Sequence, residues 1–337
     1  MNPSLQLPVI DLSSLSDGPA ARRELAEALD AACRRFGFFY LVGHGVRLER
    51  VDALMNSARE FFSSPLEDKR AIHMSKGGRA WRGYFQLGEE LTSGRPDGKE
   101  GIYFGAELNE SDPRVQAGTP LHGKNLFPSN LQLRSAVLEY MDELTRVGHQ
   151  LMTLLALGLG LDETFFRERY TGDPTLLFRI FNYPRVADPM DGWGVGEHTD
   201  YGFITLLKQD TVGGLQVRHR DGWLEVPDVP DSFVCNVGDM LERLTRGRYL
   251  SALHRVRSSA QSDRMSMALF FDPAFDAVLT PIEGIASDTE GPHTQVRWDD
   301  LDPHAAHPTY GEYLLSKVGR VFPVLREEAL QASHDAY

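Results

Sequence analysis

Hydrophobic and polar residues follow different patterns in the two parts of the chain. In the N-terminal part, apolar residues at helical spacing alternate with short apolar runs that are typical of buried strands. The pattern predicts helices at about 19–36 and 47–62, and strands at 7–12, 38–42, 84–87 and 101–105. The segment 74–127 is otherwise rich in Gly, Pro and Asp, which indicates loops.

The C-terminal part begins with a long amphipathic helix that starts near Ser129 and is ended by Gly158 and Gly160. Short apolar or alternating segments then recur between turn residues. They predict eight strands without intervening helices, at 176–183, 194–199, 202–208, 213–218, 222–226, 232–236, 252–258 and 264–271. Such a series favours a β-sandwich or jelly roll.

The order of these elements predicts a mainly β protein with flanking helices. A helical and mixed N-terminal region (1–127) precedes the long helix, the all-β core and one last helix at about 308–319, which together fill 128–337. A chain of 337 residues can form a single continuous core. We therefore expect the two regions to pack as one unit.

Composition narrows the possible partners. With 42% hydrophobic and 25% charged residues the chain is typical of soluble globular proteins, and its net charge is −13. That charge argues against a nucleic-acid or membrane surface, since both need clustered Lys and Arg. There is no signal-peptide pattern, and the two cysteines, Cys33 and Cys235, suggest buried thiols. We expect a cytoplasmic protein with no obligate protein partner.

Candidate metal ligands occur in the C-terminal part. His198 and Asp200 are one residue apart, so on a strand they would share a face. His254 follows with 53 residues between, and a jelly roll can bring such distant strands together. Two imidazoles and one carboxylate match the ligand triad of non-haem Fe(II) oxygenases. Taken alone, a His-x-Asp pair is also common in capped loops and surface pairs, and zinc would compete with iron.

A candidate carboxylate receptor follows the second histidine. Arg264 and Ser266 lie on a predicted strand, on the same face as Ala268 and Phe270. A buried guanidinium needs a partner, and its planar fork suits a carboxylate. We expect this receptor one strand away from the metal. The alternative is a structural Arg–Asp pair.

The strand at 176–183 also alternates. Leu177, Arg179, Phe181 and Tyr183 would share one face, so that an arginine and a tyrosine could enter the same cavity. The alternative for Arg179 is that its side chain reaches solvent.

Several short motifs occur in a characteristic order: LPVIDLSSL, FGFFYLVGHGV, NYP, HTD, GGLQV, NVGDMLERLT, LHRV and RMS. Together they resemble the isopenicillin N synthase-like family of 2-oxoglutarate and Fe(II)-dependent dioxygenases, over nearly the whole chain. The resemblance implies a distorted double-stranded β-helix, or jelly roll, with helical flanks.

The resemblance also implies residue roles. These are iron binding by His198, Asp200 and His254, binding of the distal carboxylate of 2-oxoglutarate by Arg264 and Ser266, and support of the co-substrate by Tyr183. His44 matches a histidine that does not bind iron. Phe181 stands where many plant members have an asparagine that faces the co-substrate.

The implied activity is hydroxylation or desaturation of a small molecule. It consumes 2-oxoglutarate and O2, gives succinate and CO2, and has ascorbate as a candidate reductant. The alternatives are a non-haem iron oxidase that does not use 2-oxoglutarate, a non-catalytic binding or regulatory protein and, more distantly, a zinc hydrolase.

The substrate pocket is expected to include Phe270, Arg179 and parts of 81–105. Arg179 or Arg82 could bind a substrate carboxylate, and an acidic residue could bind a cation. The acidic candidates are Glu89, Glu90 and Glu100. Both kinds of contact together would suit an amino acid or another small polar or specialised metabolite. Tyr84, Phe85 and Tyr103 equally permit an aromatic guest, and the alternative for the charged residues is a solvated loop face.

Overall fold

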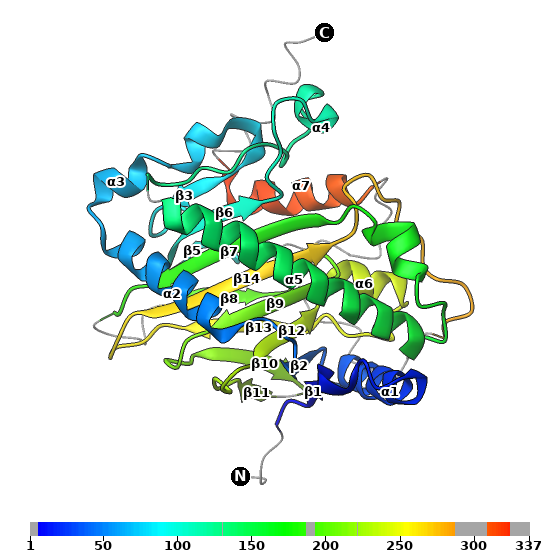
Figure 1. Ribbon diagram of the computed structural model, residues 1–337. Coiled ribbons are helices and arrows are strands. Elements are labelled where there is room, and N and C mark those ends of the chain that lie inside the picture. Colours follow the sequence, from blue (N-terminus) through cyan, green and yellow to red (C-terminus); the bar gives the residue numbers. More distant parts are fainter. Residues whose placement is uncertain (1–5, 130, 187–192, 221, 287–308, 324–337) are drawn as a thin grey trace.

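Two β-sheets form the centre of the protein (Figure 1). The computed structural model describes residues 6–129, 131–186, 193–220, 222–286 and 309–323. Among these, the larger sheet has the strand order β1 (Val9–Asp11), β2 (Phe38–Val42), β12 (Phe233–Val237), β9 (Ile204–Gln209), β14 (Arg264–Asp272), β7 (Thr175–Tyr183), β6 (Glu100–Gly105) and β3 (Gly83–Phe85). The smaller sheet has the order β11 (Gly222–Glu225), β10 (Leu215–His219), β13 (His254–Arg257) and β8 (Trp193–His198).

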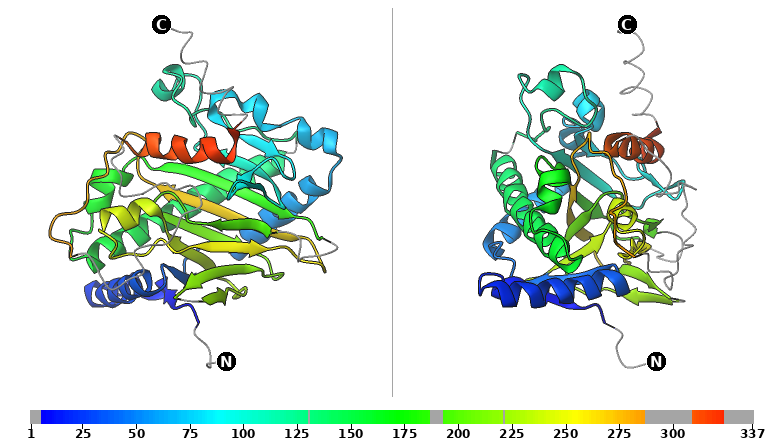
Figure 2. Two further views of the ribbon diagram at one scale, coloured as in Figure 1. Left: turned by 180° about the vertical axis from the view of Figure 1, so that it is seen from behind. Right: turned by 90° about the vertical axis from the view of Figure 1, so that its right-hand side faces the viewer.

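Helix α5 (Leu131–Gly158) runs across the outer face of the larger sheet (Figure 1). Gly148 permits close packing there, because a Cβ at this position would lie 2.4 Å from the ring of Phe271 on β14. Helices α1 (Pro19–Arg35) and α2 (Leu48–Ser63) pack beside α5, and α7 (Tyr310–Val321) lies near the opposite edge (Figure 2). The outer face of the larger sheet is thereby covered, while its inner face is left for a cavity.

Shorter elements complete the described chain. They are the helical segments Leu12–Ser14, α3 (Leu66–Arg70), Met74–Ala80, α4 (Pro113–Gln116), Arg167–Thr171 and α6 (Asp239–Leu244), and the hairpin strands β4 (Leu91–Thr92) and β5 (Arg95–Pro96). The sequence pattern missed most of them, since one or two turns are too short to show a helical period. In particular, α6 lies between β12 and β13, so the expected run of strands without helices is wrong at that point.

The long elements otherwise occur where the pattern placed them, and the mainly β architecture with flanking helices is confirmed. β7 and β14 are antiparallel partners along their full length, from Tyr183 opposite Arg264 to Thr175 opposite Asp272. Cys33 and Cys235 are buried free thiols. No helix in the described part of the chain combines the length and the apolar character that a membrane crossing requires.

Candidate metal centre

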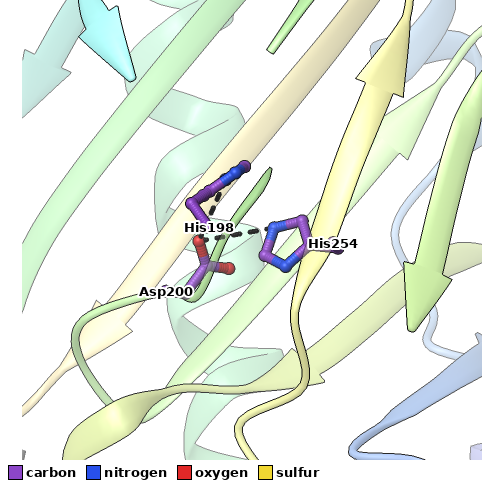
Figure 3. A group of neighbouring side chains, drawn as sticks. All are labelled: His198, Asp200 and His254. Carbon is purple, nitrogen blue, oxygen red and sulfur yellow. Dashed lines mark ion pairs between the residues drawn. The ribbon is translucent and has the colours of Figure 1, made fainter. Parts of the chain in front are cut away.

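His198, Asp200 and His254 lie together at one end of the smaller sheet (Figure 3). His198 ends β8 and stands directly opposite His254 on β13. The Nε2 atoms of His198 and His254 lie 4.0 and 3.7 Å from Asp200 Oδ1. The expectation that His198 and Asp200 share a strand face is wrong, because the strand ends at His198. Asp200 belongs to the following loop, which brings its carboxylate toward both histidines.

Hydrogen bonds orient all three side chains toward one point. Nδ1 of His198 lies 2.8 Å from the Gly196 carbonyl, and Nδ1 of His254 lies 3.2 Å from the Ala252 carbonyl. A carbonyl only accepts, so each Nδ1 carries a hydrogen, and in the neutral tautomer this leaves the Nε2 lone pair for a metal. Thr205 Oγ1 and Asn236 Nδ2 donate to Asp200 Oδ2 at 2.5 and 2.7 Å, which leaves Oδ1 for a ligand. Such supporting contacts are typical of metal ligands.

The protonation states also suit a metal. Burial, together with the neighbouring His254, lowers the pKa of His198 to about 3, so this imidazole is neutral. Burial alone would raise the pKa of Asp200, but the two histidines and the bonds from Asn236 and Thr205 outweigh it and lower the pKa. Two imidazoles and one carboxylate fit a divalent cation such as Fe(II).

The three residues line a cavity of about 90 Å³ between the sheets. As the alternation predicted, β7 contributes Leu177, Arg179, Phe181 and Tyr183, and β14 contributes Arg264, Ser266, Ala268 and Phe270. The expectation that the arginine receptor lies one strand from the metal is wrong. β14 belongs to the larger sheet and β13 to the smaller one, so Arg264 approaches the metal cluster from the opposite wall.

Arg264 forms one end of the cavity and is only 1% exposed. Its guanidinium donates to Gly213 O at 2.7 Å and Gln209 Oε1 at 3.2 Å, and contacts Ser266 Oγ at 3.4 Å. The Tyr183 ring lies 4.8 Å from Arg264 Cζ. All these partners are neutral, and Arg264 makes no ion pair with a described carboxylate, so the structural Arg–Asp alternative does not hold. A buried positive charge without a counter-ion is costly, and a ligand carboxylate would compensate it.

Arg179 forms another wall and is 9% exposed, so it does not reach solvent. Its Cζ atom lies 4.2 Å from the Tyr103 ring centroid and 4.9 Å from that of Phe270. Its Nη1 atom lies 3.6 Å from Glu90 Oε1. The predicted pocket residues Arg179, Glu90, Tyr103 and Phe270 are therefore close neighbours.

A buried ionic network supports Glu90. Lys99 Nζ lies 2.8 Å from Glu90 Oε2 and also forms an ion pair with Asp97, while Tyr103 donates to Glu90 Oε1 at 2.5 Å. Burial lowers the pKa of Lys99, but Asp97 and Glu90 outweigh this and the pKa is raised. Sequence reasoning missed Lys99 and Asp97, whose only signal is that acids and a base alternate within a loop-rich segment.

Tyr103 and the remaining predicted pocket residues do not line the metal cavity. Tyr103 instead lies between Arg179 and a separate small cavity. Arg82 is buried and donates to Leu121 O at 2.7 Å, in this small cavity behind Tyr103 and Arg179. Glu100 is paired with Lys69 at 2.8 Å, and Glu89 contacts His73 at 3.0 Å. The solvated-face alternative is wrong for Arg82, Arg179, Glu90 and Glu100, which are all buried.

Two family models match the chain. Residues 7–130 match the non-haem dioxygenase in morphine synthesis N-terminal model, and residues 167–273 match the 2OG-Fe(II) oxygenase superfamily. The chain is 43% identical to a probable iron/ascorbate oxidoreductase of Dictyostelium discoideum, over 96% of this chain and 97% of that protein. It is 35% identical to a homoarginine-6-hydroxylase of Arabidopsis thaliana, over 93% and 96%.

Solved structures show the same likeness. A full-length Neurospora crassa protein, solved in complex with alpha-KG (2-oxoglutarate) and thymine, superposes with a TM-score of 0.78 at 25% identity, over 95% of this chain and 98% of that one. The fold and the metal cluster thus define a non-haem iron enzyme with a jelly-roll core. The chain belongs to the 2OG-Fe(II) oxygenase superfamily.

Proposed function

We propose that this enzyme is a 2-oxoglutarate-dependent dioxygenase that hydroxylates or desaturates a small molecule, giving succinate and CO2. The observation that carries the proposal is the buried, uncompensated guanidinium of Arg264 across the cavity from the metal cluster. A dicarboxylate can chelate the metal at one end and neutralise that arginine at the other.

Each residue has a proposed role. His198, Asp200 and His254 hold Fe(II), which when bound supplies the redox chemistry that activates O2. Arg264 and Ser266 bind the distal carboxylate of 2-oxoglutarate, and Tyr183 packs against the guanidinium of Arg264. The apolar lining excludes water from the reacting groups.

The proposed substrate site is formed by the cavity-lining residues Arg179, Phe270 and Glu90. Tyr103 packs against Arg179 from behind, and Arg82 supports Tyr103. Charged and aromatic groups side by side suit a small polar metabolite such as an amino acid. One relative is named for homoarginine, and the solved Neurospora crassa complex holds thymine, so relatives of this chain act on or bind small polar molecules.

The test is the visible charge-transfer band that Fe(II) and 2-oxoglutarate give together without oxygen. We expect the band in the wild-type protein and its absence in His198→Ala. A protein with full iron occupancy and no band would contradict the use of 2-oxoglutarate. Succinate release measured with candidate substrates then distinguishes this activity from that of an oxidase that does not consume 2-oxoglutarate.

A further inference from the structure

Arg179 carries a buried positive charge whose hydrogen-bonding edge is almost unused. A guanidinium has five N–H donors, yet Arg179 donates no hydrogen bond to any described residue, and its Nε atom is buried without a partner. Its one polar contact, to Glu90 Oε1, spans 3.6 Å, which exceeds an ordinary hydrogen bond of about 3 Å. A buried donor set of this kind is costly unless a ligand completes it.

The carboxylates around the cavity, in contrast, already have hydrogen-bond donors or ion-pair partners. Glu90 Oε1 accepts from Tyr103, and Glu90 Oε2, which accepts no hydrogen bond from a described residue, forms an ion pair with Lys99 Nζ at 2.8 Å. Asp272, which also lines the cavity, accepts from the Phe203 amide at 3.1 Å and from the Tyr310 hydroxyl at 2.5 Å. Apart from Asp200 in the metal cluster, a cationic substrate group would therefore meet no described cavity carboxylate that lacks both a hydrogen-bond donor and an ion-pair partner.

Stacking limits how a ligand can approach Arg179. Tyr103 and Phe270 lie within 4.2 and 4.9 Å of its Cζ atom, so aromatic rings flank the guanidinium. Its N–H groups point outward in its own plane, where the two oxygens of a planar carboxylate can accept side by side. The rings also offer apolar surface to the carbon skeleton next to such a group.

The two arginines of the cavity belong to separate positions. Arg264 is opposite Tyr183 in the β7–β14 ladder, and Arg179 is opposite Ala268, four residues further along. Four residues of strand span about 13 Å. Arg264 can therefore hold the co-substrate while Arg179 engages a second anion.

We infer that Arg179 is the receptor for a carboxylate, or a similar planar oxyanion, of the primary substrate. The enzyme then selects substrates by an anionic group and not by a cationic one. This inference rests on the proposed function and names the substrate class for the same cavity. For an amino acid, it assigns recognition to the carboxylate end.

The experiment uses the anaerobic Fe(II)–2-oxoglutarate holoenzyme and ligands of one shape with different charge. Phenylacetate, phenylacetamide and phenethylamine form one such series, and pentanoate, pentanamide and pentylamine another. Binding is measured from the perturbation of the charge-transfer band. We expect each carboxylate to bind about tenfold or more tightly than its amide or amine, which corresponds to one charge-assisted hydrogen bond.

Variants test whether Arg179 causes the preference for carboxylates. Arg179→Met should abolish it and Arg179→Lys should keep it in weakened form. Arg255→Met is the matched control, because Arg255 also lies between two aromatic rings, 4.0 and 3.7 Å from Trp193 and Trp223, but does not line the cavity. This control should retain the preference, and should retain the band itself.

Three results would overturn the inference. They are carboxylates binding no better than amides or amines in the wild type, no binding by any of the six ligands, and a preference that survives in Arg179→Met. If Arg179→Met does not fold, the wild-type series and Arg179→Lys decide. The band before ligand addition tests the proposed function separately, so its absence contradicts that function, whereas a normal band without carboxylate preference contradicts only the inference.

Discussion

The two arginine positions of the cavity look alike locally but differ in how their charge is balanced. Arg264 and Arg179 are both buried, both stack on aromatic rings and both lie on the paired strands β14 and β7. Arg264 is surrounded by neutral acceptors, whereas Arg179 lies beside Glu90, whose charge is in turn shared with Lys99. The difference suggests that the first position requires an anion for charge balance, while the charge of the second is only partly offset by Glu90 and the unused N–H groups of Arg179 select an anion.

Both arginines line the cavity that contains the metal cluster. Loss of a metal ligand should therefore have the largest effect on cofactor binding. His198→Ala removes one of three ligands, and we expect iron affinity to fall by more than about a hundredfold, beyond what loss of a supporting contact causes. Iron content after desalting and the charge-transfer band measure this. His219→Ala, at a histidine that stacks on Phe36, is the control and should keep both. Full iron occupancy in His198→Ala would show that the cluster is not the metal site.

Of the two arginine positions, the one at Arg179 should contribute more to the free energy of unfolding, through the ionic network of Glu90, Asp97 and Lys99. Lys99→Met leaves Glu90 and Asp97 buried without their shared cation, and we expect a loss of about 3–5 kcal/mol in the free energy of unfolding. Urea denaturation measures it. Lys124→Met removes an exposed partner of Glu110 and should cost only about 0–1 kcal/mol. Equal losses in the two variants would mean that the buried network is not compensated as described.

The position of Arg264 should be the more sensitive one for the co-substrate. Arg264→Leu removes a charge-assisted contact worth about 2–3 kcal/mol, so half-saturation should need roughly 30- to 150-fold more 2-oxoglutarate. Band titration measures it. At saturating 2-oxoglutarate the carboxylate preference assigned to Arg179 should persist. Arg257→Leu, at an exposed arginine paired with Glu225, is the control. An unchanged titration would remove the argument for a dicarboxylate.

The same contrast explains what the sequence could predict. Arg264 and Ser266 are two residues apart on one strand, so alternation alone placed them on one face, and the chain segments around the metal ligands carry recognisable motifs. Most of the strand core was predictable for the same reason, since alternation and turns are local. The assignment of the strands to two opposed sheets could not be predicted, because it depends on contacts between segments that are distant in sequence.

The network at Arg179 could not be predicted in the same way. Glu90 lies just before a short hairpin, and Asp97 and Lys99 lie just after it. In such a segment no helical or strand period of hydrophobic residues identifies a buried face. Burying three charged side chains from a loop-rich segment becomes favourable only when they meet one another and Tyr103. For that reason their charges looked like a solvated surface in the sequence and are a buried wall in the structure.

Asp272 allows the smallest and most specific test of the charge balance near Arg179. Burial raises the pKa of Asp272 to about 7, although bonds from Tyr310 and Phe203 oppose the shift. An unfolded aspartate titrates near about 3.9. Between about pH 4 and 7 the folded state therefore holds a proton that the unfolded state has lost, and this group makes stability fall as pH rises, by up to ~1.4 kcal/mol per unit. Above pH about 7 its contribution is constant.

Asp272→Asn should remove that slope. The amide oxygen can still accept from Phe203, and the side chain no longer titrates. Unfolding free energies measured by urea denaturation from about pH 5 to 8 should then converge at low pH, with the variant gaining relative to the wild type as pH rises. Parallel curves for the two proteins would show that Asp272 is ionised throughout.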